Sequence, residues 1–194
     1  APFFRYEKQQ KGRLREFLQF NCDLVGDDSP EADAEMLALL IETLRAFGLT
    51  SDDIVVRVSD RRVWMDFLAE RGVKDEAQAR EALAVIDKLE REPREVLEAK
   101  LSPFGLTLGG IETFLAEAKP EFFGRLQRNL AARGLEDFCV LDLRIVRGLA
   151  YYTGLVFEVF DRRQENRAVA GGGRFDRLLS DLSGGKVNLP AIGF

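Results

Sequence analysis

The chain has 194 residues, 46% of them hydrophobic, with a formal net charge of −5 and no histidine. This length and composition are typical of one or two globular domains, and they exclude a disordered tail, a collagen-like chain and a disulfide scaffold. No apolar run approaches the roughly 18 residues that a membrane span needs, and no leader opens the chain, so we expect a cytoplasmic protein. Cys22 and Cys139 lie far apart in apolar settings, which predicts buried free thiols.

The absence of histidine restricts the chemistry that this chain can perform. It excludes Ser-His-Asp and Cys-His catalysis and any zinc site with a histidine ligand, and two cysteines alone cannot build a structural metal site. We therefore expect no metal site made of protein side chains. Arginines, carboxylates, tyrosines and backbone groups remain, and they suit phosphate chemistry, where positioning and charge neutralisation dominate.

The first sixty residues alternate between strand and helix patterns. Residues 3–7 and 17–25 are predicted to form the two arms of a β-hairpin around a basic loop. Ser29 then opens a helix as its N-cap, apolar residues recur at helical spacing, and Gly48 ends it. Residues 54–59 form a short β-branched strand.

The middle of the chain changes to helical periodicity, which predicts a helical insertion between two parts of a core. Prolines and glycines separate the helices. The predicted helices cover residues 61–71, 76–91, 93–100, 110–118 and 121–133.

Strand patterns return in the last third of the chain, in which we predict strands over 140–146, 152–160 and 167–170 and a short helix over 174–182. The whole pattern indicates an α+β fold, with a largely antiparallel sheet flanked by helices. The expected units are a first core part (1–65), a helical insertion (66–135) and a second core part (136–194). Both ends read as cut: the chain starts without Met in a strand-like run and stops as another strand opens, so we expect a piece of a longer protein.

Two segments carry arginines at strand ends. Arg5 and the basic loop that follows it could cradle a polyphosphate, because each guanidinium fork matches two phosphate oxygens. The alternative for that loop is a solvated basic hairpin. Arg147 precedes a glycine turn and the pair Tyr151 and Tyr152, whose hydroxyls suit a small polar ligand. The alternative for the tyrosines is packing in the core.

A third segment, Gly171–Asp176, has three glycines that allow a backbone to approach a ligand closely. We interpret these glycines as a link between a strand and a helix. The segment is neither a GxGxxG nor a Walker sequence, so it predicts no dinucleotide or P-loop site.

In combination these segments resemble a known family. Phe4–Glu7 with Gln10–Arg13 and Gln19 resembles motif 2 of class II aminoacyl-tRNA synthetases in its histidyl form. Arg147–Tyr152 resembles the first histidine-specific motif of histidyl-tRNA synthetases, and Gly171–Asp176 is similar to part of the second. Residues 29–35 and 190–194 also match family patterns. The resemblance covers roughly 1–65 and 136–194, and the middle matches only as the variable insertion of the family.

The resemblance implies a class II synthetase-like catalytic domain that activates L-histidine with ATP to histidyl-adenylate and transfers it to tRNA(His). It implies ATP with Mg²⁺ as a substrate complex, no prosthetic group, no membrane partner and a homodimer in the full-length protein. Arg5 would hold the α-phosphate, and Arg147 would face it from the other side as the second catalytic arginine. Glu7 and Arg13 would help bind adenine and the outer phosphates, and Phe17 would stack on adenine.

The resemblance also implies a histidine site. Gln19 would bind the α-amino group, and Asp23 and Tyr152 would each hold one imidazole nitrogen. The remaining residues that the resemblance places at the histidine site are Tyr151, Gly172 and Phe175.

The sequence departs from the family pattern at several points. Ala150 stands where many relatives carry Asp, and Phe175 stands where Tyr is usual. Motif 1, most of motif 3 and the anticodon-binding domain are absent, so we expect the isolated chain to be inactive as a synthetase. The alternative is a non-catalytic paralogue, the regulatory subunit of ATP phosphoribosyltransferase. The set Arg5, Arg13, Gln19 and Arg147 favours the enzyme.

Overall fold

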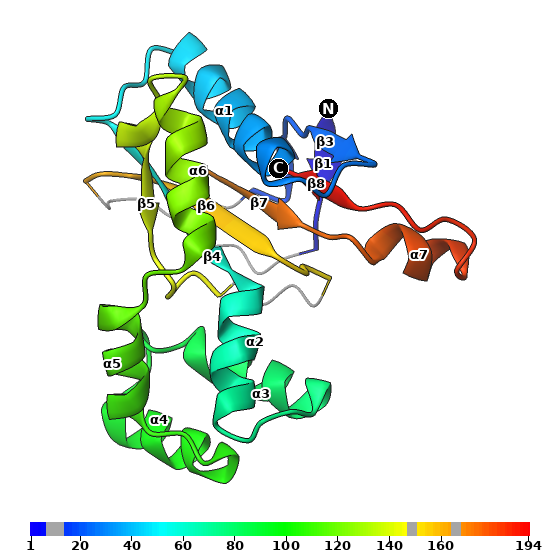
Figure 1. Ribbon diagram of the computed structural model, residues 1–194. Helices are drawn as coiled ribbons and strands as arrows, with labels where there is room; N and C mark the ends of the chain where they lie inside the picture. Colours follow the sequence, from blue (N-terminus) through cyan, green and yellow to red (C-terminus); the bar gives the residue numbers. More distant parts are fainter. Residues whose placement is uncertain (7–13, 147–150, 164–167) are drawn as a thin grey trace.

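The strands of the chain build one main sheet and one separate hairpin (Figure 1). The computed structural model describes residues 1–6, 14–146, 151–163 and 168–194. Within these residues the main sheet has six strands in the order β3-β8-β7-β6-β4-β5, and β1 pairs only with β2. The strands are β1 (Pro2–Phe4), β2 (Glu16–Leu18), β3 (Asp23–Val25), β4 (Ile54–Asp60), β5 (Cys139–Leu141), β6 (Leu155–Asp161), β7 (Ala170–Arg174) and β8 (Ala191–Gly193).

The predicted α+β class is confirmed, and the sheet is antiparallel except at one edge. β5 runs parallel to β4, with Val56 opposite Cys139 and Val58 opposite Leu141. The largely antiparallel sheet that the sequence predicted is therefore confirmed, with one parallel pair at this edge. The reason is the long connection through the helices, since parallel neighbours need a crossover that a tight hairpin cannot supply.

One face of the sheet is covered by two helices, which lie side by side in Figure 1. Ser29 caps α1, as predicted, because its hydroxyl accepts a hydrogen bond from the Ala32 amide at 3.2 Å. Leu37 and Ile41 of α1 and Leu130 of α6 are fully buried against Phe157 of the sheet. The helices are α1 (Pro30–Ala46), α2 (Arg61–Glu70), α3 (Glu76–Ile86), α4 (Arg94–Leu101), α5 (Leu108–Glu117), α6 (Glu121–Ala131) and α7 (Leu178–Ser183).

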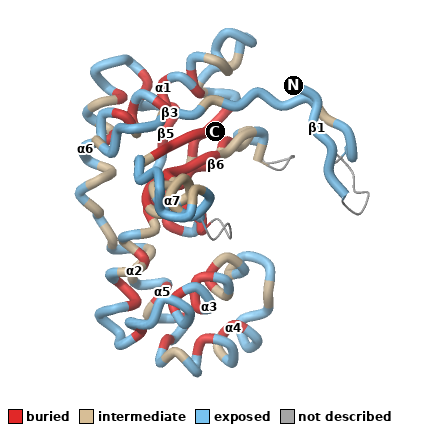
Figure 2. The backbone as a smooth tube through the Cα atoms, turned by 90° about the vertical axis from the view of Figure 1, so that its right-hand side faces the viewer, coloured by how far each residue is buried: buried red, intermediate tan, exposed pale blue. Residues whose placement is uncertain are grey.

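Helices α2 to α5 form a lower lobe with a hydrophobic core of its own (Figures 1 and 2). The single tryptophan, Trp64, ties this lobe to the sheet, because its indole N–H donates to the Leu143 carbonyl at 2.8 Å. The predicted insertion runs to residue 135, whereas Leu126 and Leu130 of α6 pack with α1 in the core under the sheet. Helical periodicity identifies a helix but does not say which core its apolar face joins.

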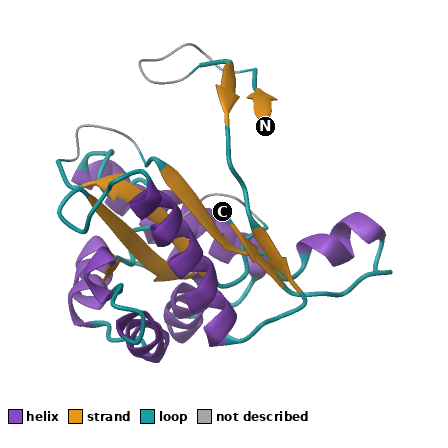
Figure 3. Cartoon of the chain, turned by 90° about the horizontal axis from the view of Figure 1, so that it is seen from above, coloured by secondary structure: helices purple, strands orange, loops and turns teal. Residues whose placement is uncertain are grey.

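The N-terminal hairpin projects away from the sheet (Figures 2 and 3). Phe3 lies opposite Phe17, and their ring centroids are 6.0 Å apart. The predicted continuous arm over 17–25 is wrong: the strand stops at Leu18, and Asp23–Val25 pairs instead with β8 of the main sheet. The described part of this hairpin exposes most of its apolar side chains, so it contributes little to the core.

Three other predicted boundaries differ from the structure. The strand over 140–146 ends at Leu141, because the carboxylate of Asp142 accepts hydrogen bonds from the Arg144 backbone and side chain and folds the chain into a turn. The helix over 76–91 ends at Ile86. The three glycines of 171–173 lie inside β7, not between a strand and a helix, and α7 begins only at Leu178.

The two cysteines differ in accessibility, so the prediction that both are buried is wrong for Cys22. Cys22 is partly exposed, whereas Cys139 is buried and its burial raises the thiol pKa to about 12. We expect a disulfide reagent to modify Cys22 in the native protein and Cys139 only after denaturation, since the thiolate is the reactive form. Mass spectrometry of the labelled peptides checks this, and Cys22→Ser should abolish the native reaction. Labelling of Cys139 at the rate of Cys22 would contradict it.

In the part of the chain that the structure describes, no helix is both long enough and apolar enough to span a membrane.

Candidate functional site

The face of the sheet opposite α1 and α6 brings together two of the predicted histidine-site residues. Asp23 of β3 lies opposite Gly193 of β8, which lies opposite Gly173 of β7. Partners directly opposite each other in adjacent strands point to the same side of a sheet. A Cβ at Gly193 would collide with the Asp23 carboxylate, and a Cβ at Gly173 would come within 2.8 Å of the Tyr152 ring. Asp23 and Tyr152 therefore share one face, with the Asp23 carboxylate over Gly193 and the Tyr152 ring over Gly173; we call these two glycines the glycine floor.

Aromatic rings line one side of this face. Tyr152 is 6% exposed and packs with Ile145 and Val156. The ring of Tyr151 lies 4.6 Å from the Tyr152 ring and 6.1 Å from the Phe175 ring, which it meets edge-on. The sequence analysis left packing in the core as an alternative for the two tyrosines, and the Tyr152 ring is packed in this way.

Gly172 faces the other way from Gly173. A Cβ at Gly172 would come within 2.7 Å of the Phe157 ring in the core and would collide with the Gly193 carbonyl. Gly172 therefore allows β7 and β8 to approach over the core. Gly172 can therefore contribute to the predicted histidine site only through its backbone.

The hairpin holds the described part of the predicted ATP site. The Arg5 guanidinium lies 3.7 Å from the centroid of the Phe17 ring, so it covers a face of the ring that was expected to stack on adenine. The hairpin is a separate two-stranded sheet that projects from the main sheet (Figure 3). Glu7, Arg13 and Arg147, as well as the departure at Ala150, lie outside the described residues.

Gln19 lies on the exposed segment that joins the hairpin to the sheet. Its backbone N–H donates to the Ala1 carbonyl at 3.1 Å, and its side-chain amide donates to Asn21 Oδ1 at 2.5 Å. The side-chain amide of Gln19 is therefore hydrogen-bonded to a neighbour on its own segment, and Gln19 precedes Asp23 by four residues.

A buried ion pair, which the sequence analysis missed, fixes the strand beneath the glycine floor. Arg174, at the end of β7, is 2% exposed, and its guanidinium donates to Asp33 Oδ1 at 2.6 and 2.9 Å. It also donates to the Asp27 carbonyl and to Asp176 Oδ1, both at 3.1 Å. Burial raises the pKa of Asp33 to about 6, against the opposing effect of Arg174. One guanidinium thus joins the start of α1, the loop before it and β7.

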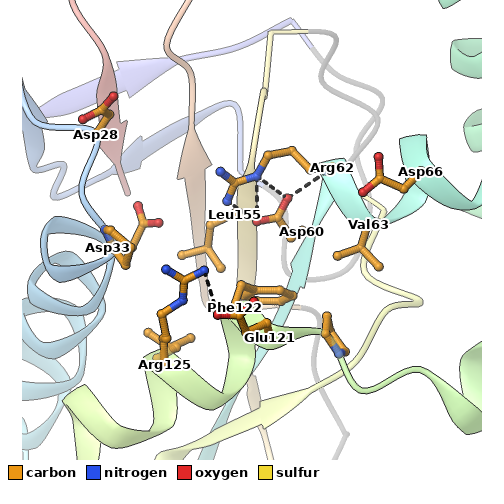
Figure 4. A pocket seen from close by; sticks show the side chains of 13 residues that line it. Asp28, Asp33, Asp60, Arg62, Val63, Asp66, Glu121, Phe122, Arg125 and Leu155 are labelled. Atoms are coloured by element: carbon orange, nitrogen blue, oxygen red, sulfur yellow. Dashed lines mark hydrogen bonds and ion pairs between the residues drawn. The ribbon is translucent and has the colours of Figure 1, made fainter.

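A cavity of about 290 Å³ lies on the other face of the sheet, between α1, the start of α2 and α6 (Figure 4). Asp60 and Leu155, which line it, are paired across β4 and β6 on the side that α1 covers. Asp60 binds Arg62, while Arg125 binds Glu121. None of the predicted site residues that the structure describes lines this cavity. Nor do the described residues contain a cluster of three or more side chains that could hold a metal ion.

Comparisons with known proteins agree on one family. The family model described as histidyl-tRNA synthetase matches residues 1–194. The histidine–tRNA ligase of Opitutus terrae is 42% identical over 100% of this chain and 49% of its own length. The chloroplastic/mitochondrial histidine–tRNA ligase of Arabidopsis thaliana is 34% identical over 98% of this chain and 42% of its own length. The chain spans about half the length of the curated relatives it matches.

Solved structures share the fold. The histidyl-tRNA synthetase from Nostoc sp. PCC 7120 matches with a TM-score of 0.77 at 24% identity, over 100% of this chain and 50% of that chain. A Bacillus halodurans protein described as an ATP phosphoribosyltransferase regulatory subunit/histidyl-tRNA synthetase matches with a TM-score of 0.74 at 25% identity, over 100% of this chain and 53% of that chain. The α+β architecture is thus the one that these proteins have.

Proposed function

Because this chain belongs to the histidyl-tRNA synthetase family, we propose that it forms the histidine-binding part of a catalytic domain that activates L-histidine and transfers it to tRNA(His). The observation that supports this most directly is the pairing of Asp23 and Tyr152 on one sheet face across the Gly173–Gly193 floor. A bound imidazole needs a polar group at each ring nitrogen, which a carboxylate and a phenol supply.

The recognition step follows from this geometry. Asp23 accepts a hydrogen bond from one imidazole N–H, and the Tyr152 hydroxyl meets the other ring nitrogen. An amino acid without these nitrogens leaves both groups unpaired, and sites built in this way reject such analogues by up to about 10⁴–10⁵-fold. Tyr151 and Phe175 close the apolar side of the site, and Gln19 receives the α-amino group.

The activation step requires charge stabilisation more than proton transfer, because adenylation is an in-line displacement at phosphorus. Arg5 and Arg147 bind the α-phosphate from two sides and neutralise the charge that develops there. Glu7, Arg13 and Phe17 hold the nucleotide, which arrives with Mg²⁺ as ATP.

Histidine binding to the chain tests the proposal. We expect Asp23→Ala and Tyr152→Phe each to weaken L-histidine binding by about tenfold or more, since each leaves a ring nitrogen without its partner. Isothermal titration calorimetry measures the dissociation constant, and Asp52→Ala, at an exposed turn, is the matched control. L-Leucine should not bind. Unchanged histidine affinity in both variants would contradict the assignment of Asp23 and Tyr152 to the histidine site.

A further inference from the structure

Three arginines from three elements gather around one carboxylate where the helical lobe meets the sheet. Arg61 opens α2, Arg80 lies in α3 and Arg177 directly precedes α7 (Figure 1). Arg177 Nη2 lies 3.0 Å and Arg80 Nη2 3.7 Å from the same oxygen, Glu76 Oε1. We call Arg61, Arg80, Arg177 and Glu76 the arginine cluster. A single carboxylate oxygen thus serves two guanidiniums of this cluster.

The third guanidinium, that of Arg61, is half-buried without a counter-ion. Among the residues that the structure describes, no hydrogen bond or ion pair reaches its side chain; its backbone N–H donates to the Gly154 carbonyl at 3.0 Å. Burial and the neighbouring charges of Arg80 and Arg177 lower the pKa of Arg61, and Glu76 opposes this only in part. An unpaired guanidinium removed from water is costly, so the cluster has excess positive charge.

The carboxylate at the start of α2 is engaged by other groups. Asp60 is the N-cap, and its carboxylate accepts hydrogen bonds from the Arg62 backbone N–H at 2.8 Å and from the Arg62 guanidinium at 2.9 and 3.2 Å. The first turn of α2 itself has no acidic residue. Asp60 thus compensates the helix end and Arg62, and it leaves the Arg61 guanidinium without a carboxylate of its own.

The cluster lies at the rim of the sheet face described above. The side chain of Arg61 borders a small space lined by Ile145 and Val156, which also pack with Tyr152. Arg177 follows Phe175 by two residues and is 68% exposed. A ligand that reaches this rim from solvent can therefore contact Arg61 and Arg177 together.

We propose that Arg61, Arg80 and Arg177 bind a phosphate group, and that Glu76 holds two of these guanidiniums until the phosphate displaces it. A phosphate presents several oxygens, so it can pair with the Arg61 fork and replace Glu76 at the other two. The phosphate can belong to a nucleotide or to an RNA strand, and the chemistry of the cluster is the same for both. The proposal does not depend on histidine recognition by Asp23 and Tyr152.

Two probes test the proposal on the chain itself: ATP by calorimetry and a short fluorescein-labelled single-stranded RNA by anisotropy. We expect Arg61→Met to weaken binding of at least one probe by about tenfold and, for RNA, to reduce the slope of log K against log salt by about 0.7. Glu76→Gln should tighten the same probe by about threefold, since it removes the competing anion while leaving the helix intact. A purely structural role for Glu76 would not produce tighter binding.

The controls separate the source of the phosphate from a loss of folding. Arg45→Met removes an exposed arginine that is likewise paired with a glutamate, and it should leave both probes unaffected. Arg61→Lys keeps the charge but not the fork and should restore only part of the affinity. If circular dichroism shows that Arg61→Met is unfolded, the same binding measurements are made on Arg177→Met.

If the arginine variants weaken only RNA binding, the phosphate belongs to an RNA strand. If they weaken only ATP binding, the phosphate belongs to a nucleotide. Absence of binding of either probe to the wild-type chain, or equal affinity in the wild type and the arginine variants, overturns the proposal.

Discussion

Replacing Arg174 with methionine is expected to lower the free energy of unfolding by about 3–5 kcal/mol, the usual cost of removing one partner from a buried ion pair. The guanidinium is 2% exposed and makes two hydrogen bonds to Asp33, one to the Asp27 carbonyl and one to Asp176. Without it, the Asp33 carboxyl would stay mostly buried and would lose its counter-ion. Urea unfolding followed by circular dichroism measures the change, and Arg45→Met at an exposed ion pair should cost well under about 1 kcal/mol.

The pH dependence of this loss distinguishes a buried charge from lost packing. Burial raises the pKa of Asp33 to about 6, above its ordinary value of 3.8. Protonation of Asp33 therefore favours the folded state, and its contribution to stability is full below about pH 4 and lost as the pH rises through 6. In Arg174→Met the pKa of Asp33 should rise further, because the carboxyl has lost its counter-ion. The loss of stability caused by the substitution should therefore be smaller at pH 5 than at pH 8. A loss that is equal at both pH values would contradict the ion-pair explanation.

A double variant refines the test. Asp33→Asn combined with Arg174→Met removes the charge that the single variant leaves uncompensated, so it should recover part of the lost stability. Two groups in direct contact are expected to be non-additive in this way. Additive losses would mean that Arg174 stabilises mainly through the Asp27 carbonyl and Asp176.

Local patterns predicted the elements whose signals lie within a few residues. The Ser29 cap and the apolar spacing of α1 place that helix within one or two residues, and the β-branched run of 54–59 lies within β4. The parallel partner of β4 and the position of α6 under the sheet depend on contacts between distant segments. Local periodicity in the sequence does not predict those contacts.

The candidate site shows the same division. Asp23 and Tyr152 were expected together because the resemblance implies that each holds one imidazole nitrogen. The register of β3, β8 and β7, with the Tyr152 ring against Gly173, places both on one face. Arg174 and Asp33 are 141 residues apart, so nothing local could pair them, although an arginine directly after three glycines was a visible signal. The arginine cluster was hidden because its members come from all three predicted units, and nothing local in the sequence brings them together.

Replacing Arg147 with alanine in the full-length protein is expected to reduce histidine-dependent ATP–pyrophosphate exchange by about 10²–10³-fold, the usual effect of removing one preorganised donor to a developing charge. The preceding residue, Val146, is buried and packs with the helical lobe. In sequence no acidic residue follows before Glu158. We therefore expect Arg147 to pair with an anion, and under the proposed function that anion is the α-phosphate of ATP.

Two further measurements identify the kind of effect. Histidine affinity should change little in Arg147→Ala, because the lost interaction is made with the phosphate and not with the amino acid. Arg147→Lys should rescue poorly, since a point charge cannot reproduce the fork of a guanidinium. A regulatory paralogue would bind histidine without any exchange activity in the wild type. Absence of wild-type exchange, or near-normal exchange in Arg147→Ala, would therefore remove Arg147 from the mechanism, and with it the main argument for an enzyme over a paralogue.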